Sequence, residues 1–143
     1  MTDLDGFPGS KNPWGTITAI NLNSGLILWQ TPFGDYKEID LYDMQGKKIK
    51  SGTENFGGVT GTAGNILFAT GTIDKKFYAI NSLDGEVLWE YELPFVGSNP
   101  PVVFETNGKQ YILVTSTGSF SLAAGYPDKV KFGNRFLLFG LEK

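Results

Sequence analysis

The stretch from Gly57 to Leu93 reads GGVTGTAGNILFATGTIDKKFYAINSLDGEVLWEYEL and decides the fold. Its apolar and β-branched residues occur in short runs separated by Gly, Asn and Asp, a pattern that is typical of consecutive strands. One of the turns contains Asp84-Gly85, where glycine readily takes the positive φ that a tight hairpin requires. We therefore expect four antiparallel strands here, at residues 57–62, 66–69, 77–80 and 86–89.

A partial copy of this pattern precedes it at a constant offset of sixty residues. The matching pairs are Ala19-Ile20-Asn21 with Ala79-Ile80-Asn81, Gly25 with Gly85, and Leu28-Trp29 with Leu88-Trp89. A repeated four-stranded unit is typical of a β-propeller, in which one blade takes about 40–50 residues. The longer offset is explained by an insertion at 35–55, which is rich in charge, lacks a long apolar period and is expected to hold a short helix or hairpin.

The sequence is therefore interpreted as all-β, a partial propeller of about two and a half blades of four-stranded antiparallel sheets. The hairpin 16–30 should lack the inner strands of its blade. The last blade should run from an apolar strand at 102 to one at 132–141, with a loop at 116–131, and should lack an outer strand. The divisions expected are 1–34 as a loop and half blade, 35–55 as the insertion, 56–93 as a complete blade, and 94–143 as an incomplete last blade.

Trp29 and Trp89 occupy the same position in the two copies of the repeat. A large aromatic residue repeated on an outer strand most simply packs between one blade and the next. We therefore expect both tryptophans to stabilise the fold and assign neither of them a role in ligand binding.

Composition narrows the possible functions of the 143 residues. The chain contains 19 Gly and 7 Pro, which favour turns over helices, and it carries a net charge of −3 with no basic stripe, which argues against a nucleic-acid partner. It has no Cys and no His, so the usual nucleophile, base and soft-metal ligands are missing. No apolar run approaches the roughly 20 residues that a membrane-spanning helix needs. We identify no catalytic or metal-binding constellation.

Three motifs give the chain a family resemblance. AINxxxGxxLW, ENFGG followed by TAGxxxFxxGTxDxKFYA, and NGKQYILV together resemble the C-terminal end of the pyrroloquinoline-quinone (PQQ)-dependent dehydrogenases, and among these the glucose dehydrogenase-like quinoproteins. The resemblance extends from Asp5 to Val114. The AxNxxxGxxLW motif alone also occurs in non-catalytic propellers such as outer-membrane assembly lipoproteins.

The resemblance implies a closed propeller several times longer than this chain, so that these residues would be a fragment. It also implies PQQ with calcium as the cofactor of the parent protein, a sugar or alcohol substrate, a respiratory electron acceptor and a periplasmic location, although we expect no signal peptide in this sequence. The family's calcium ligands and its catalytic Asp would lie in blades that precede this segment. The chain alone is therefore expected to bind no cofactor tightly and to be inactive.

The resemblance places one segment of this chain beside the flat, tricarboxylate cofactor. In related quinoproteins the residue before the Gly-Gly pair is aromatic or apolar and lies near the quinone, and here it is Phe56, preceded by Asn55. Glycines at the inner end of a blade could let the backbone approach a ligand, and Asn55 offers a donor and an acceptor. Alternatively, Phe56 is a hydrophobic plug and Asn55 a turn residue. Trp14 is a weaker candidate, since its loop could equally cover a blade.

The last loop departs from the family pattern. Where the family has a glycine-rich run, this chain reads STGSF at 116–120 and continues SLAAGYPDKVKFGN. A cofactor contact from this loop therefore cannot be transferred from the family to this chain.

Three functions are compatible with the sequence. The chain is the C-terminal propeller segment of a PQQ-dependent dehydrogenase, a non-catalytic propeller that serves as a protein-interaction scaffold, or a truncated chain without activity. In each case the incomplete blades would expose strand edges and apolar faces, which favours a homo-oligomer, most simply a two-fold dimer.

Overall fold

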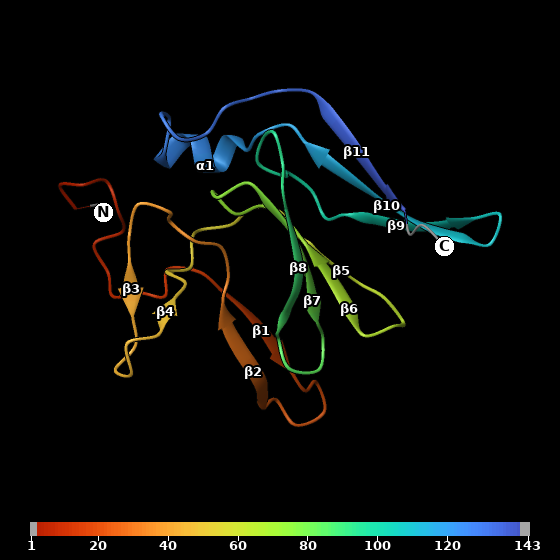
Figure 1. Cartoon of the computed structure of the whole chain (residues 1–143), viewed down its shortest axis with the longest axis horizontal. Coiled ribbons are helices and arrows are strands. Elements are labelled where there is room, and N and C mark those ends of the chain that lie inside the picture. The colour runs from red at the N-terminus through yellow and green to blue at the C-terminus, as the bar shows by residue number, and fades with distance from the viewer. Residues whose placement is uncertain (1–2, 141–143) are drawn as a thin grey trace.

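The computed structural model describes residues 3–140, so Met1 and the end of the last expected strand at Leu141 lie outside the described residues. Three antiparallel sheets lie side by side, with the largest between the other two (Figure 1). We call them the hairpin sheet, the central sheet and the last sheet. The hairpin sheet consists of β1 (Thr16–Ile20) and β2 (Ile27–Pro32), and the central sheet of β5 (Val59–Gly61), β6 (Ile66–Ala69), β7 (Lys76–Asn81) and β8 (Val87–Glu92).

The central sheet is the complete four-stranded meander that the repeat predicts, in the order β5-β6-β7-β8. Successive side chains of a strand point to opposite faces of the sheet, and those of β7 are buried on both faces. Phe77 and Ala79 pack toward the last sheet in a cluster with Val114. Tyr78 and Ile80 face the opposite way and pack in a cluster with Phe33, against which Trp29 of the hairpin sheet is placed. Two of the core clusters thus lie on opposite sides of β7.

The sixty-residue repeat is confirmed at the level of strand register. Trp29 pairs with Ala19 across β1 and β2, and Trp89 pairs with Ala79 across β7 and β8, with a register shift after the alanine in both hairpins. The Trp29 indole N–H donates to the carbonyl of Ser82 at 2.9 Å, in the turn between β7 and β8. Trp89 meets Phe139 of the last sheet with 5.7 Å between ring centroids. Each tryptophan therefore packs against the next sheet.

The last sheet has three strands, in the order β11-β10-β9. They are β9 (Val102–Thr106), β10 (Lys109–Ser116) and β11 (Arg135–Gly140). Within the described residues β11 pairs only with β10, so the outer edge of this sheet is open, as expected. Strand β11 begins three residues later than predicted, because Gly133 makes a backbone bond to Thr117 before the ladder begins.

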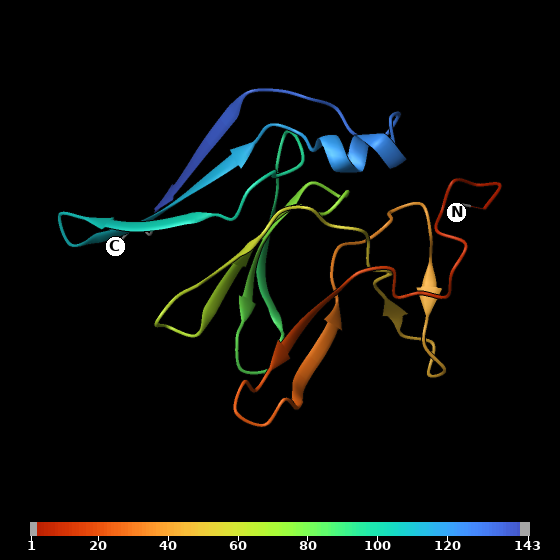
Figure 2. The ribbon, with the colours of Figure 1, turned by 180° about the vertical axis from the view of Figure 1, so that it is seen from behind.

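One element was missed. The stretch 116–131, which we expected to be a loop, contains the helix α1 (Phe120–Gly125). The side chain of Ser119 caps this helix by accepting a hydrogen bond from the backbone N–H of Leu122 at 3.4 Å. Viewed from either side, α1 lies at the end of the molecule away from the β7–β8 turn (Figures 1 and 2).

The insertion at 35–55 contains a short hairpin of β3 (Leu41–Tyr42) and β4 (Lys48–Ile49), one of the two structures expected there. Its two ends are more deeply buried than its charge indicates. Tyr36, Ser51 and Thr53 are almost fully buried, and Tyr36 belongs to a third apolar cluster with Leu122 of α1. The insertion is therefore anchored in the fold at its base, while the hairpin at its tip is largely exposed.

Across residues 3–140, none of the helical structure combines the length and the apolar character that crossing a membrane requires.

Candidate functional site

Phe56 lies on the segment that leads into β5. The backbone N–H of Phe56 donates to the carbonyl of Gly71 at 3.2 Å, and Asn55 forms an isolated antiparallel bridge with Thr72. These contacts fix the backbone at Asn55 and Phe56, yet Phe56 is 53% exposed. An aromatic ring on a fixed backbone that is nevertheless half exposed is available for contact with another molecule.

The glycines that follow Phe56 are required by packing within the protein. A Cβ on Gly57 would overlap the backbone of Thr70 and Gly71, and a Cβ on Gly58 would overlap Pro100. Both glycines therefore allow close approach within the protein, and the interpretation that they make room for a ligand is not needed to explain them.

Phe56 borders a cavity of about 540 Å³ that lies between the segment before β5 and the loop between β10 and β11. Its aromatic lining residues, which we call the cavity group, are Phe56, Phe120 and Phe132. Its hydroxyl-bearing lining residues are Ser98, Thr117, Ser119 and Ser121. Among residues 3–140 no charged side chain lines this cavity. The volume falls in the range of small-molecule sites.

Backbone contacts hold the walls of the cavity in place. Gly118 has a φ of +91°, and its N–H donates to the carbonyl of Val96 at 2.9 Å. The hydroxyls of Ser98 and Thr117 are 2.8 Å apart and share a hydrogen bond. The positive φ at Gly118 turns the chain out of β10 and brings Phe132 beside it, because a Cβ there would lie 2.8 Å from the Phe132 ring.

Trp14 does not line this cavity. It packs with Phe7, Tyr36 and Tyr126 in a set of aromatic side chains that we call the buried group. Its ring meets that of Tyr36 at 5.6 Å in a T-shaped arrangement, and its indole N–H donates to the carbonyl of Ser10 at 2.6 Å. Of the three residues predicted from the sequence, only Phe56 lines the cavity; Asn55 precedes it outside the lining, and Trp14 packs in the buried group.

Glu54 connects the buried group with the segment that carries Phe56 of the cavity group. It was not singled out from the sequence. Its carboxylate accepts hydrogen bonds from the hydroxyls of Tyr36 at 3.0 Å and Tyr126 at 2.7 Å. Burial raises the pKa of both hydroxyls, and the negative charge of Glu54 raises them further. Both tyrosines therefore stay protonated and act as donors. The carboxylate fixes the backbone immediately before Asn55.

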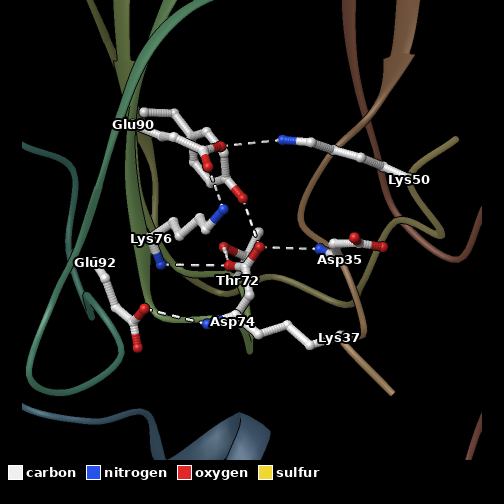
Figure 3. Close-up of polar contacts among 9 residues, drawn as sticks. Asp35, Lys37, Lys50, Thr72, Asp74, Lys76, Glu90 and Glu92 are labelled. Atoms are coloured by element: carbon white, nitrogen blue, oxygen red, sulfur yellow. Dashed lines mark hydrogen bonds and ion pairs between the residues drawn. The ribbon is translucent and has the colours of Figure 1, made fainter. Parts of the chain in front are cut away.

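A second polar cluster surrounds Asp74, in the GTxDxKFYA motif (Figure 3). Asp74 is 6% exposed and accepts hydrogen bonds from the Tyr78 hydroxyl at 2.5 Å, the Thr72 hydroxyl at 2.5 Å and the Asp35 backbone N–H at 3.0 Å. Ion pairs of Glu90 with Lys76 and Lys50 lie above it. Each buried side-chain nitrogen and oxygen of residues 3–140 has a partner, so this cluster serves the fold: it joins the base of the insertion to the central sheet.

The residues around the cavity fit a flat quinone only in part. The cavity group offers apolar ring faces and the hydroxyls offer polar contacts at the rim, which suit a planar ring that carries carbonyl oxygens. Carboxylates would require cationic partners, and none lines the cavity. Across residues 3–140, moreover, no three His, Cys, Asp or Glu side chains come close enough together to hold a metal ion. A tricarboxylate cofactor with calcium would need further residues from outside this part of the chain.

Comparison with known proteins gives a consistent assignment. Residues 1–112 match the family described as PQQ: glucose/ethanol/alcohol dehydrogenase, beta-propeller domain. The chain is 32% identical over 136 residues to the quinoprotein glucose dehydrogenase of Escherichia coli (strain K12). The alignment covers 88% of this chain and 17% of that protein. It is also 32% identical over 141 residues to the quinate/shikimate dehydrogenase (quinone) of Acinetobacter baylyi. This alignment covers 96% of this chain and 17% of that protein. The chain thus spans about a sixth of the length of these relatives.

Solved structures show the same fold. A quinohemoprotein alcohol dehydrogenase from Pseudomonas putida HK5 superposes with a TM-score of 0.64 at 21% identity, over 86% of this chain and 16% of that one. A europium-containing methanol dehydrogenase superposes with a TM-score of 0.55 at 26% identity, over 71% of this chain and 23% of that one. The three open sheets are therefore a partial β-propeller, as the repeat predicts.

Proposed function

Because the chain belongs to the PQQ family of glucose/ethanol/alcohol dehydrogenase β-propellers, we propose that it is the segment of such a dehydrogenase that supplies one wall of the cofactor site. The proposal rests on the position of Phe56. Its ring is half exposed on a fixed backbone and borders a cavity of about 540 Å³. Phe56 would contact the face of the quinone, and Asn55 would supply polar contacts at its rim. The bound quinone supplies the redox chemistry, accepting electrons from a sugar or alcohol.

The role of this chain is to shape the site. Hydrogen bonds from Tyr36 and Tyr126 to Glu54, and from Phe56 to Gly71, set the backbone on which the Phe56 ring is presented. A preset aromatic surface lowers the entropic cost of ordering a flat ligand. The base and the calcium ligands would come from other blades, so we expect the isolated chain to bind PQQ weakly and to catalyse no quinone-dependent dye reduction with glucose.

Titration of the isotope-labelled chain with PQQ, followed by NMR, tests the proposal. The largest shifts are expected at the backbone amides of Asn55 and Phe56. Phe56→Ala should abolish them, while Phe104→Ala, on an exposed ring of β9 that does not line the cavity, should leave them unchanged. Shifts that are absent, or that survive in Phe56→Ala, would contradict the assignment of Phe56, and turnover by the isolated chain would contradict the division of labour.

A non-catalytic scaffold is the alternative. It would account for the two repeated tryptophans, but it gives no reason for a half-exposed Phe56 beside a cavity. The coding region that precedes this segment distinguishes the two: further blades with a calcium-binding carboxylate set support the dehydrogenase, and blades without such a set support the scaffold. We also propose a periplasmic location for the parent, which cell fractionation would test.

The open strand edges point to self-association. Within residues 3–140, β1 pairs only with β2 and β11 only with β10, and β11 exposes Phe136 (69%) and Leu138 (59%). Unpaired edges with apolar side chains favour pairing with another chain. We therefore propose that the isolated chain forms a homo-oligomer, most simply a two-fold dimer, and that light scattering will give twice the chain mass. A monomeric mass at micromolar concentration would refute this.

A further inference from the structure

The turn between β9 and β10 consists of Asn107 and Gly108 alone. Thr106 pairs with Lys109 across the two strands, so these two residues make the whole connection. The φ angle is 52° at Asn107 and 69° at Gly108, and a type I′ turn requires positive values at both positions. Both residues are exposed, and within residues 3–140 β9 pairs only with β10. The turn therefore lies in water at the end of an edge strand, where local opening costs little.

The Asn107 side chain and the Gly108 backbone amide are neighbouring groups that can react with each other. The side-chain carbonyl carbon of an asparagine is an electrophile, and the backbone nitrogen of the next residue can attack it to close a succinimide ring. Glycine favours this attack because it has no side chain to shield the nitrogen. A Cβ at Gly108 would meet no atom within 4 Å, so the space around it is open. Within residues 3–140, the Gly108 N–H also donates to no backbone carbonyl. The nitrogen is thus accessible and unengaged.

The same chain contains a matched asparagine without these features. Asn65 is exposed and has a φ of 58°, close to that of Asn107. The residue after it is the β-branched Ile66, whose N–H donates to the Thr62 hydroxyl at 3.3 Å. A bulky following residue and an engaged N–H both oppose ring closure. Asn107, in contrast, is the only asparagine of the sequence that is followed by glycine.

We propose that Asn107 is a modification site, at which the folded chain converts asparagine to aspartate and isoaspartate with water as the only co-reactant. The Gly108 nitrogen forms a bond to the side-chain carbonyl carbon. The bond from that carbon to the amide nitrogen breaks, and ammonia leaves with the proton of the Gly108 N–H. Water then opens the ring. Attack at the side-chain carbonyl gives aspartate, and attack at the backbone carbonyl gives isoaspartate. No electrons are transferred, and the inference is independent of the proposed function.

The two products affect the hairpin differently. Aspartate tolerates the left-handed conformation much as asparagine does, so it should keep the turn while adding a negative charge. Isoaspartate routes the main chain through the side chain and lengthens the turn by a methylene group. A turn of two residues fixes the register of its strands, so this longer connection no longer fits the pairing of Thr106 with Lys109. Isoaspartate should therefore loosen β9 from β10.

Incubation of the full 143-residue chain without denaturant, at mildly alkaline pH, tests the site. Peptide mapping by mass spectrometry should find the mass shift of an amide converted to an acid at Asn107. Over the same time Asn65 should stay unmodified. Labelling with a methyltransferase specific for isoaspartate should locate that product at Asn107, and Asn107→Ser, which cannot close the ring, should lose the label. Backbone amides of β9 should exchange faster in the isoaspartate fraction, whereas freshly prepared Asn107→Asp should exchange like the wild type.

The modification site would be overturned if Asn107 converts no faster than Asn65 in the folded chain. It would also be overturned if Asn107 converts in urea but not in the folded chain, because the turn would then protect it. Conversion in the folded chain without faster exchange of β9 would contradict the effect assigned to isoaspartate. Equally fast exchange in Asn107→Asp would assign that effect to the charge instead of the longer turn.

Discussion

The buried group and the cavity group contain the same kinds of residue in opposite states. Tyr36 of the buried group is 1% exposed, meets three other aromatic rings and has its hydroxyl bound by Glu54. The cavity group is 49–84% exposed, and its polar neighbours are uncharged hydroxyls. The helix α1 joins the two, since Leu122 packs with the buried group and Phe120 belongs to the cavity group.

The difference separates side chains that stabilise the fold from side chains that remain available. A ring enclosed by protein, with its polar atom satisfied, contributes its free energy to folding. A ring left in water contributes little free energy to folding. It contributes free energy of burial only when another molecule covers it. Mutations in the buried group should therefore change stability, and mutations in the cavity group should change binding.

The largest effect is expected for Tyr36→Ala. Truncating a large side chain that is 1% exposed leaves a cavity among Phe7, Trp14 and Tyr126, so the free energy of unfolding should fall by about 3–5 kcal/mol. Chemical denaturation would measure this. Tyr42→Ala, at a tyrosine that is 60% exposed, is the matched control and should change stability by about 0.5 kcal/mol or less. Equal losses in the two variants would show that the buried group is not a core.

Alkaline pH should weaken the fold next, because three of its tyrosines have raised pKa values. Burial, followed by contacts with Tyr126 and Glu54, raises the pKa of Tyr36 above its ordinary value of 10.0. Burial with the charge of Asp74 raises the pKa of Tyr78, and burial with the contact to Glu54 raises that of Tyr126. A raised folded-state pKa means that the unfolded chain loses these protons first. Stability is therefore fully present below pH 10 and falls as the pH rises above it.

Denaturation curves between pH 8 and 12, a range about two units either side of the ordinary tyrosine pKa, would measure this decline. Tyr36→Phe should make it shallower, because one of the three tyrosines with a raised pKa is removed. Tyr42→Phe, at an exposed tyrosine, should keep the wild-type slope. A slope that is the same in Tyr36→Phe would contradict the assignment.

A smaller effect is expected for Glu54→Gln. The amide keeps one acceptor oxygen, but it can no longer accept from both Tyr36 and Tyr126 through a charged group, so stability should fall by about 1–2 kcal/mol. Glu86→Gln, on an exposed turn residue, provides the control in the same denaturation experiment. Because Glu54 precedes Asn55, the amide shifts of Asn55 and Phe56 should change in Glu54→Gln and stay constant in Glu86→Gln.

The sequence predicts the propeller sheets because their signals are local. Turn glycines, alternation along β7 and the matched positions of Trp29 and Trp89 all lie within hairpins, and the register confirms them. The helix α1 has six residues, too few for an apolar period to show, and its only local signal is Ser119 at the N-cap.

The contacts that define the candidate site are distant in sequence. Glu54 meets Tyr36 across 18 residues and Tyr126 across 72, and no spacing rule links such positions. The resemblance points to Asn55 and Phe56 because they belong to a contiguous motif, and their contact with a cofactor stays a prediction. The packing of Trp14 against Tyr36 has no local signal, because Tyr36 lies at the base of the insertion, a segment that the sequence indicates to be an excursion from the fold.

The smallest change in stability is expected for Phe120→Ala, and it is the sharpest test of the comparison. Phe120 is 84% exposed, so truncation removes little buried area, and Ala is the better helix former in the first turn of α1. The loss of the contact with Phe132 and the gain in helix propensity oppose each other, and the free energy of unfolding should stay within about 0.5 kcal/mol of the wild type. A destabilisation approaching that of Tyr36→Ala would place Phe120 in the core and remove the distinction between the two aromatic groups.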